Sequence, residues 1–500
     1  MTWPPPGTHT PEWLAQRSRL SPRTPALLWG DAVWSFAGLE RRVAALAGRL
    51  ARAGVAPGDR VALMARNGPA FVLAAWAVPR LGGVLVPLNL RLTASELAWQ
   101  VRDCGASLLA HDRANAQRAR ELVEAVPGLR LLDVGTTGDD SEAVAAPETI
   151  DLSSVHSIIY TSGTTGRPKG AMLTFGNHLW NAIGSVLNLG LREDDRWLAC
   201  LPLFHVGGLA ILIRSVVYGI PVVLQDGFDA AAVNEAIDGR GVTIVSVVST
   251  MLQRMLEERG ERPYPPTLRC VLVGGGPVPR PLLEECARHG IPAVQTYGLT
   301  EAASQVTTLA PADALRKLGS AGRPLFPVAV RIADEAGRPL PPGEAGEILV
   351  RGPTVMAGYF GRPEETARAL RDGWLHTGDI GYLDQEGYLY VLDRRDDLIV
   401  SGGENVYPAE VEAVLRQHPA VADAAVIGLP DERWGQTVAA AVVLRPGCAV
   451  DGDELVRFCR ERLAGYKVPR CFRIVPSLPR NAAGKLLRRA LREDWPAKSA

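Results

Sequence analysis

Hydrophobic positions along the first 390 residues form two alternating patterns. Short runs of branched apolar residues, such as residues 61–64 and 84–87, predict buried strands. Longer segments rich in alanine, leucine and arginine lie between these runs, and residues 71–80 predict a helix. Similar apolar runs recur at residues 157–160, 222–224, 242–248 and 270–273. This alternation is typical of an α/β fold in which helices cover parallel sheets.

The pattern changes near residue 346. Residues 346–392 contain short apolar runs separated by glycine and aspartate turns, which predicts a β-rich subdomain closing the large part of the chain. A charged cluster follows at residues 393–397, and Pro408 then stands near the start of an amphipathic helical pattern. We therefore expect an N-terminal domain at residues 1–395 and a small mobile α+β domain at residues 396–500, with a hinge near residue 396.

The composition fits this two-domain interpretation, because 500 residues exceed what one hydrophobic core usually supports. Lys and Arg together number 54, as do Asp and Glu, so no net field would recruit nucleic acid or an anionic membrane. The apolar stretch at residues 201–224 contains His205, Arg214 and Pro221, which favours a buried core segment over a membrane span. The N-terminus has no signal-peptide pattern and the cysteines are scattered, so we expect reduced thiols and a cytoplasmic location.

A loop of small and hydroxyl residues follows the strand predicted at residues 157–160. Its sequence is Tyr160-Thr-Ser-Gly-Thr-Thr-Gly-Arg-Pro-Lys169-Gly170, and the candidate phosphate ligands are Thr161, Ser162, Gly163, Thr164, Thr165 and Lys169. Glycines let backbone N–H groups wrap an anion, and hydroxyls and an ammonium complete such a cradle. The spacing is neither the Walker A pattern nor the dinucleotide fingerprint. The composition alone fits a flexible surface turn equally well.

The complete string resembles the signature loop of the adenylate-forming superfamily, which includes acyl-CoA synthetases, luciferases and the adenylation domains of peptide synthetases. Further segments match motifs of that superfamily in the same order: Leu201-Pro-Leu-Phe-His205, Gly274-Gly-Gly-Pro277, Gln295-Thr-Tyr-Gly-Leu-Thr-Glu301, Asp372-Gly-Trp-Leu-His-Thr-Gly-Asp379, Ser401-Gly-Gly-Glu-Asn-Val-Tyr-Pro408 and Pro479-Arg-Asn-Ala-Ala-Gly-Lys485. The resemblance implies a ligase that converts a carboxylate and ATP into an acyl adenylate and pyrophosphate, and then transfers the acyl group to CoA.

Two of these motifs contain candidate ligands for adenosine and the α-phosphate. The candidate adenine-binding residues are Gly274, Gly275, Gly276 and Tyr297, which combine close backbone approach with a flat aromatic face. By resemblance, Thr300 contacts the α-phosphate and Glu301 helps to hold Mg²⁺, a cation that suits one carboxylate plus phosphate oxygens and water. Outside these motifs, Tyr297 would be interpreted as a core aromatic residue and Glu301 as a solvated helix residue.

Asp379 and Arg394 are the candidates for binding the ribose, because a carboxylate can accept from both hydroxyls and a guanidinium can donate. Their ordinary alternatives are a turn aspartate and a surface salt bridge. Lys485 is a candidate for catalysis, since only five of the 54 basic residues are lysines and a compact ammonium fits a crowded site. In the superfamily the matching lysine serves adenylation.

A lysine on the small domain would have to leave before CoA could enter, which implies a hinged movement. By resemblance, Asp396 lies at the hinge, and Gly402 and Gly403 then line the channel for the pantetheine of CoA. Asp393 stands where the superfamily often has glycine.

The acid is indicated by weaker signals. Arg214 lies within an apolar segment, where it either binds a second carboxylate of the substrate or pairs with an internal Asp or Glu. The sequences of residues 201–216, 274–277, 295–305 and 317–325 together resemble those of the o-succinylbenzoate–CoA ligases of menaquinone biosynthesis. That resemblance implies that Arg214 and Ser304 hold the non-reacting end of the acid and that His205 lies beside the reacting carboxylate.

Several alternatives remain open from the sequence. Medium-chain, long-chain and aryl acid–CoA ligases share the nucleotide motifs, as does luciferase. An amino-acid adenylation domain is disfavoured by Val206, where such domains use an aspartate nearby, and no carrier domain follows. A catalytically inactive nucleotide-binding module is disfavoured by the joint presence of Lys169, Glu301 and Lys485. The expected partners are the carboxylic acid, ATP and CoA, with a homo-oligomer as a further possibility.

Overall fold

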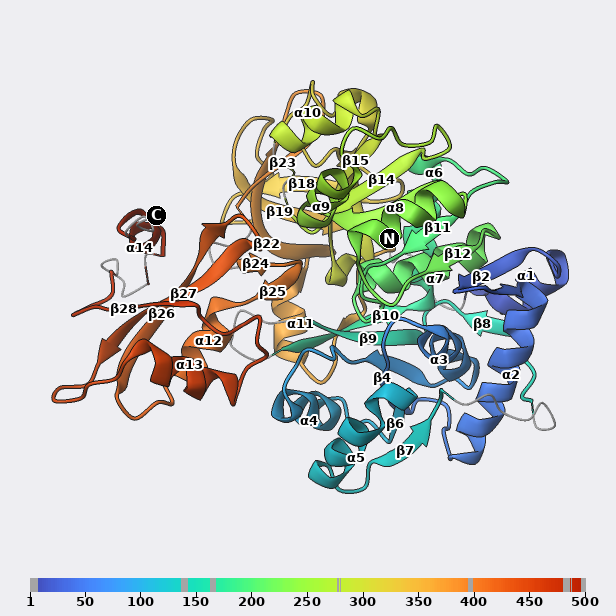
Figure 1. Cartoon of the computed structure of the whole chain (residues 1–500), viewed down its shortest axis with the longest axis horizontal. Coiled ribbons are helices and arrows are strands. Elements are labelled where there is room, and N and C mark those ends of the chain that lie inside the picture. The colour runs from blue at the N-terminus through green and yellow to red at the C-terminus, as the bar shows by residue number, and fades with distance from the viewer. Residues whose placement is uncertain are drawn as a thin grey trace.

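The computed structural model describes residues 8–135, 143–161, 168–276, 278, 280–393, 399–479, 486 and 488–495. These residues form a large N-terminal part, coloured blue to light orange in Figure 1, and a small C-terminal part in deep orange and red. The helices of the large part are α1 (Trp13–Leu20), α2 (Phe36–Arg52), α3 (Pro69–Arg80), α4 (Ala94–Asp103), α5 (Ala116–Ala125), α6 (Phe175–Leu189), α7 (Val206–Tyr218), α8 (Ala230–Gly239), α9 (Ser249–Arg259), α10 (Arg280–Arg288) and α11 (Pro363–Ala369).

One sheet of the large part has the strand order β20–β10–β9–β5–β4–β6–β7. Its strands are β4 (Arg60–Met64), β5 (Val84–Pro87), β6 (Leu108–His111), β7 (Arg130–Asp133), β9 (Val155–Thr161), β10 (Lys169–Thr174) and β20 (Gly358–Tyr359). Strand β4 runs parallel to β5 and β6. Along β4, Val61 and Leu63 face one hydrophobic cluster, whereas Ala62 and Met64 face another. The strand is buried on both faces, which explains its unbroken apolar run.

A second sheet has the order β17–β16–β15–β14–β13–β11–β12–β2–β3. Its strands are β2 (Pro25–Trp29), β3 (Ala32–Ser35), β11 (Trp197–Ala199), β12 (Val222–Leu224), β13 (Ile244–Val248), β14 (Cys270–Gly274), β15 (Ala293–Leu299), β16 (Ser304–Leu309) and β17 (Arg323–Pro324). The neighbouring strands β15, β14, β13, β11, β12 and β2 run parallel to one another. The 3₁₀ turn η3 (Thr300–Ala302) links β15 to β16, which is antiparallel to it. A small pair, β1 (His9–Pro11) and β8 (Thr149–Asp151), lies outside both sheets. Within the described ranges, no helix is long and apolar enough to cross a membrane.

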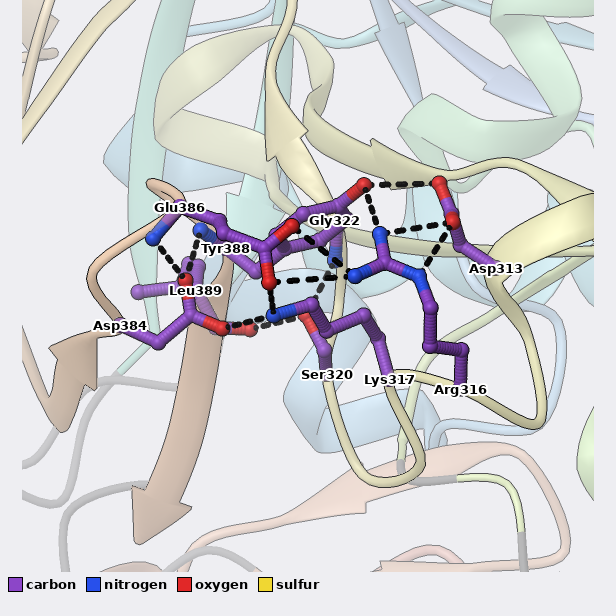
Figure 2. Close-up of polar contacts among 9 residues, drawn as sticks. All are labelled: Asp313, Arg316, Lys317, Ser320, Gly322, Asp384, Glu386, Tyr388 and Leu389. Carbon is purple, nitrogen blue, oxygen red and sulfur yellow. Dashed lines mark hydrogen bonds and ion pairs between the residues drawn. The ribbon is translucent and has the colours of Figure 1, made fainter.

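The β-rich subdomain consists of β18 (Ala329–Ala333), β19 (Gly346–Arg351), β21 (Leu370–Arg371), β22 (Trp374–Leu383) and β23 (Leu389–Asp393). Figure 2 shows how charged side chains join the turn between β22 and β23 to the segment of residues 313–322. The Nζ atom of Lys317 lies 2.6 Å from a carboxylate oxygen of Asp384 and 2.5 Å from one of Glu386. These contacts raise the pKa of Lys317. Arg316 bonds to Glu386 and Tyr388 as well, so the turn that follows β22 is held firmly.

The small part contains a sheet of order β25–β24–β27–β26, with β28 parallel to β27. Its elements are β24 (Ile399–Ser401), β25 (Glu404–Val406), β26 (Val421–Asp431), β27 (Gly435–Leu444), β28 (Cys471–Ile474), α12 (Pro408–Leu415), α13 (Gly452–Arg460) and α14 (Arg488–Glu493). Val426 of β26 packs into the cluster that also contains residues of α12 and α13, whereas the next residue, Ile427, packs into the cluster with Leu491 of α14. Figure 1 shows α14 on the opposite side of the sheet from α12 and α13.

The expected fold class is confirmed, and the predicted helix at residues 71–80 and strand at residues 84–87 correspond to α3 and β5. Two details differ from the simple alternating pattern. Lys169 lies not in the loop but at the first position of β10, because the apolar residues Ala171 and Leu173 continue the sheet. The strand expected at residues 242–248 begins at Ile244, where pairing with β11 and β14 starts.

Candidate active site

The sequence motifs meet around a cavity of about 360 Å³. It opens at the carboxyl ends of β13 and β14, where ligands commonly bind in open α/β sheets, and is closed by the small domain. Of the predicted site residues, those lining it are Thr161, Lys169, His205, Arg214, Gly274, Gly275, Thr300, Glu301, Ser304, Asp379, Gly402 and Gly403. The fold thus brings together residues as distant in the sequence as Thr161 and Gly403. This would not be expected if each motif were an independent surface turn.

The phosphate side of the cavity combines one carboxylate with one ammonium. The hydroxyls of Thr161 and Tyr359 both donate to Oε1 of Glu301, at 3.2 and 2.9 Å. The ammonium of Lys169 lies 5.2 Å from the centre of the Tyr359 ring. Ser162, Gly163, Thr164 and Thr165 lie outside the described residues. Glu301 would supply the single carboxylate that Mg²⁺ needs beside phosphate oxygens, and the chain fits this metal in that respect.

The nucleoside side is built by β14, β15 and β22. Gly274 ends β14, and Gly275, the next residue, adopts a left-handed φ of 80°, which glycine tolerates best. Tyr297 is 5% exposed, and its ring packs in the large hydrophobic cluster while its hydroxyl donates to Oδ2 of Asp379 at 2.6 Å. The predicted contact of the Tyr297 ring with adenine stays a prediction. Gly276 continues the turn after β14, and Arg394 lies outside the described residues.

His205 meets the small domain at the mouth of the cavity. Its Nε2 lies 3.2 Å from Oε2 of Glu404, and Oε1 of Glu404 accepts a hydrogen bond from Arg91 at 2.6 Å. Burial alone would raise the pKa of Glu404, but His205, Arg91 and Lys467 outweigh it and lower the pKa. Glu404 therefore stays ionised and joins the two domains through charge.

A second set of contacts crosses between the domains beside the first. Lys467 is almost fully buried, and its Nζ lies 2.6 Å from Oε1 of Glu96 on α4 and 2.8 Å from Oε1 of Glu410 on α12. Burial alone would lower the pKa of Lys467, but Glu410 and Glu96 outweigh it and raise the pKa. Next to it, Asn89 donates to the hydroxyl of Tyr466 at 3.3 Å.

Gly402 and Gly403 form the turn between β24 and β25 and line the cavity. Both adopt left-handed φ angles, 59° and 84°. A side chain at Gly402 would also come within 2.7 Å of the ring of Trp434, so two independent constraints favour glycine there. The hinge candidate Asp396 and the catalytic candidate Lys485 lie outside the described residues.

A larger cavity of about 1330 Å³ lies against the first and shares lining residues with it. The shared residues include Arg91, Pro202, Phe204 and Gly402. Its lining is rich in arginine: Arg66, Arg91, Arg240, Arg254, Arg433 and Arg470. The guanidinium groups of Arg433 and Arg470 lie 4.9 and 4.8 Å from the ring of Trp434. Such a surface suits a ligand that carries phosphates and an aromatic base.

Arg214 lines the first cavity and is 2% exposed. Its Nη2 donates to Oδ1 of Asn181 at 2.7 Å, and its guanidinium lies 5.2 Å from the ring of Trp197. Within the part of the chain that the structure describes, no Asp or Glu forms an ion pair with it, and its Nε has no hydrogen-bond partner. The internal carboxylate that a structural arginine would need is therefore missing among these residues.

Sequence reasoning missed several residues of this region. Glu404 lay within a matched motif but was given no function, and Lys467 was given no function either. Arg91 and Tyr359 lie outside the matched motifs, and Asn181 carries no local signal that would distinguish it from any helix residue. Only the packing of α6 against α7 brings Asn181 to Arg214.

Comparison with known proteins identifies the family. Residues 14–360 match the family described as AMP-binding enzyme, and residues 410–485 match the AMP-binding enzyme C-terminal domain. The chain belongs to the AMP-binding enzyme family. The predicted membership of the adenylate-forming superfamily is thereby confirmed.

Several similar proteins are named as succinylbenzoate–CoA ligases or synthetases. A 2-succinylbenzoate–CoA ligase of Geobacillus kaustophilus is 54% identical over 491 residues, covering 98% of this chain and 99% of the relative. An o-succinylbenzoate CoA synthetase of Bacillus subtilis, a double mutant bound to its product analogue OSB-NCoA, is 44% identical with a TM-score of 0.92, covering 97% and 99% of the two chains. The Bacillus subtilis enzyme with its acyl-adenylate intermediate OSB-AMP has the same identity but a TM-score of 0.75, covering 97% and 98%.

The two TM-scores bear on the arrangement of the domains. Because the two Bacillus subtilis structures share the same identity with this AMP-binding enzyme, their different scores reflect a different overall arrangement. The described residues superpose more closely on the product-analogue complex than on the acyl-adenylate complex. Glu404 and Lys467 make their contacts with the large domain in the arrangement described here.

Proposed function

We propose that this chain is an ATP-dependent ligase that joins o-succinylbenzoate to CoA. The observation that carries the choice of acid is Arg214, a buried guanidinium that lines the cavity and has no carboxylate partner among the described residues. A buried positive charge of this kind is costly unless an anion arrives. The second carboxylate of a dicarboxylic acid would be that anion. Relatives at about half identity over the full chain bear this ligase name.

In the first step the substrate carboxylate attacks the α-phosphorus of ATP. A bond forms between carboxylate oxygen and phosphorus, and the bond to pyrophosphate breaks, leaving an acyl adenylate. We assign Thr161, Lys169 and Thr300 to the phosphates and Asp379 to the ribose, because these side chains line one cavity. When bound, Mg²⁺ would neutralise phosphate charge, with Glu301 as its protein ligand. Lys485 is assigned to this step by its motif.

In the second step the thiol of CoA, after loss of its proton, attacks the acyl carbon, and AMP leaves as the carbon–oxygen bond breaks. We assign the turn of Gly402 and Gly403 to the pantetheine, because it lines the cavity beside His205. The adjoining arginine-rich cavity would take the phosphates and adenine of CoA, with Arg433 and Arg470 beside Trp434.

We further propose that the chain divides into domains at residues 1–395 and 396–500 and that the small domain turns about Asp396 between the two steps. The two Bacillus subtilis structures, which differ in ligand and in overall arrangement, support this proposal. Since ATP and CoA are intracellular substrates, we place the reaction in the cytoplasm. The possible homo-oligomer stays a prediction.

A panel of acids tests the choice of substrate. Pyrophosphate release would be measured with o-succinylbenzoate, aryl acids and medium- and long-chain fatty acids, with and without CoA. We expect o-succinylbenzoate to give the highest kcat/KM, and Arg214→Ala to raise its KM far more than that of benzoate-like monoacids. A preference for fatty or aryl monoacids would replace the proposed substrate by that class. No pyrophosphate release with any acid would indicate a nucleotide-binding module without activity.

A further inference from the structure

Asn181 is the residue that the fold places against the buried end of Arg214. It lies on α6, and its Oδ1 accepts the hydrogen bond from Nη2 of Arg214 at 2.7 Å. Its Nδ2 donates to the backbone oxygen of Gln305 on β16 at 3.0 Å. Because a carbonyl oxygen only accepts, this second bond fixes which way the amide points. Both side chains are buried, at 3% exposure for Asn181 and 2% for Arg214.

The other titratable groups around Arg214 are neutral near pH 7. Tyr218 and Cys270 interact with it electrostatically, and burial raises the pKa of both, to about 12 for Cys270. His178 lies one turn before Asn181 on α6, and burial, reinforced by the charge of Arg214, lowers its pKa to about 3. Among the described residues, the charge of Arg214 is therefore not neutralised by its surroundings.

An asparagine at this position is unusual physically, because a carboxylate would be the ordinary partner of a buried guanidinium. Aspartate has nearly the same shape as asparagine and would form a charge-assisted bond to the same Nη2. It would also cancel the charge that the cavity presents to its ligand. An amide instead holds the guanidinium in place through one nitrogen and leaves its charge uncancelled in a residue that lines the cavity.

We propose that Asn181 is a specificity-determining residue: it positions Arg214 with a neutral amide, and so reserves the positive charge for the second carboxylate of a dicarboxylic acid. This inference rests on the proposed function, in which Arg214 binds the non-reacting carboxylate. Asn181 acts through Arg214 and is a positioning residue. Because the side chain of Asn181 carries no charge, it leaves the charge of Arg214 available to the second carboxylate of a dicarboxylic acid.

The test compares Asn181→Asp with Asn181→Ala. Both variants lose the donor to the backbone oxygen of Gln305, but only aspartate adds a charge beside Arg214. The substrates are o-succinylbenzoate and its two half-analogues, 4-oxo-4-phenylbutanoate and 2-butanoylbenzoate, each of which keeps one carboxylate. Pyrophosphate release gives kcat and KM for each, and thermal unfolding reports on the fold.

We expect Asn181→Asp to lower kcat/KM for o-succinylbenzoate about 100-fold, mainly through KM, because an internal carboxylate replaces that of the substrate. Asn181→Ala should lower it only about three- to tenfold, because the charge remains but is less well held. The half-analogue that is activated should change less than about threefold in both variants. Asn181→Asp gains an ion pair with Arg214 but sets a carboxylate oxygen against the backbone oxygen of Gln305, so thermal unfolding should show only that both variants remain folded at the assay temperature.

Equal losses in the two variants, or equal losses for o-succinylbenzoate and the half-analogue, would overturn the inference and leave Asn181 a structural residue. If the aspartate variant does not fold, the alanine variant decides: a loss of kcat/KM for o-succinylbenzoate no greater than that for the half-analogue would overturn the inference. The proposed function fails separately, if the unaltered chain does not prefer o-succinylbenzoate over its half-analogues.

Discussion

Glu96→Gln isolates one contact between the domains with little other disturbance. Glu96 caps α4 by accepting hydrogen bonds from the backbone N–H and the hydroxyl of Thr93 through Oε2, and it meets Lys467 of the small domain through Oε1. Glutamine is equally suited to the capping box, so the helix start should be kept. What is lost is the negative charge 2.6 Å from a buried ammonium.

The size of the effect follows from the burial of the pair. The side chains of Lys467 and Glu96 are 3% and 14% exposed, so solvent screens their interaction weakly. A hydrogen bond between charged groups contributes about 1.5–3 kcal/mol. Glutamine cannot replace it, because its single carbonyl oxygen stays with Thr93 and its NH2 group then faces Lys467. The arrangement that holds this contact should lose about 1.5 kcal/mol or more, which is at least about tenfold in an equilibrium constant.

Two assays separate the half-reactions. Thioester formation from preformed acyl adenylate and CoA should slow about tenfold in Glu96→Gln, whereas ATP–pyrophosphate exchange without CoA should change less than about twofold. Glu410→Gln is the matched control, because it alters the same lysine contact within the small domain. That control should lower thermal stability without favouring one half-reaction. Equal slowing of both half-reactions by Glu96→Gln, or no slowing of thioester formation, would refute the reasoning.

Three further predictions follow from the site and the core. Lys485→Ala should abolish acyl-adenylate formation yet leave thioester formation from preformed adenylate largely intact, and equal loss of both in rapid-quench assays would exclude the hinged scheme. Arg470→Ala should raise KM for CoA about three- to tenfold with KM for ATP unchanged, whereas the exposed Arg457→Ala, outside the arginine-rich cavity, should change neither. His178 has a folded-state pKa of about 3 against an ordinary value of 6.5, so its contribution to stability is present above pH 6.5 and is lost as pH falls. Urea unfolding should therefore show about 1 kcal/mol more loss between pH 6.5 and 5.5 for the unaltered chain than for His178→Gln, and equal losses would contradict the assignment.

Much of the fold could be predicted from the hydrophobic pattern, because the pattern records burial directly. Strand β4 is apolar from Val61 to Met64 because both its faces are covered there. Glycine at residue 402 is favoured by a left-handed backbone and by the nearby ring of Trp434. Such local constraints act on neighbouring residues and so appear in the sequence. The nucleotide motifs could be found in the sequence because each consists of neighbouring residues.

Contacts between distant elements could not be predicted in this way. The pairing of Glu404 with Arg91 joins residues 313 positions apart and exists only because of how the two domains are arranged. Asn181 reaches Arg214 only because α6 packs against α7. The sequence left open whether Arg214 pairs with an internal Asp or Glu. In the structure its partner is the amide of Asn181, which no periodicity or motif could have indicated.

The most direct test of the central claim is the ratio of kcat/KM for o-succinylbenzoate to that for its activated half-analogue, measured by thioester formation with ATP and CoA. The proposed function predicts a ratio of at least about 100 for the unaltered chain and a ratio near one for Arg214→Ala. A ratio near one in the unaltered chain would contradict it, because Arg214 would then select no second carboxylate.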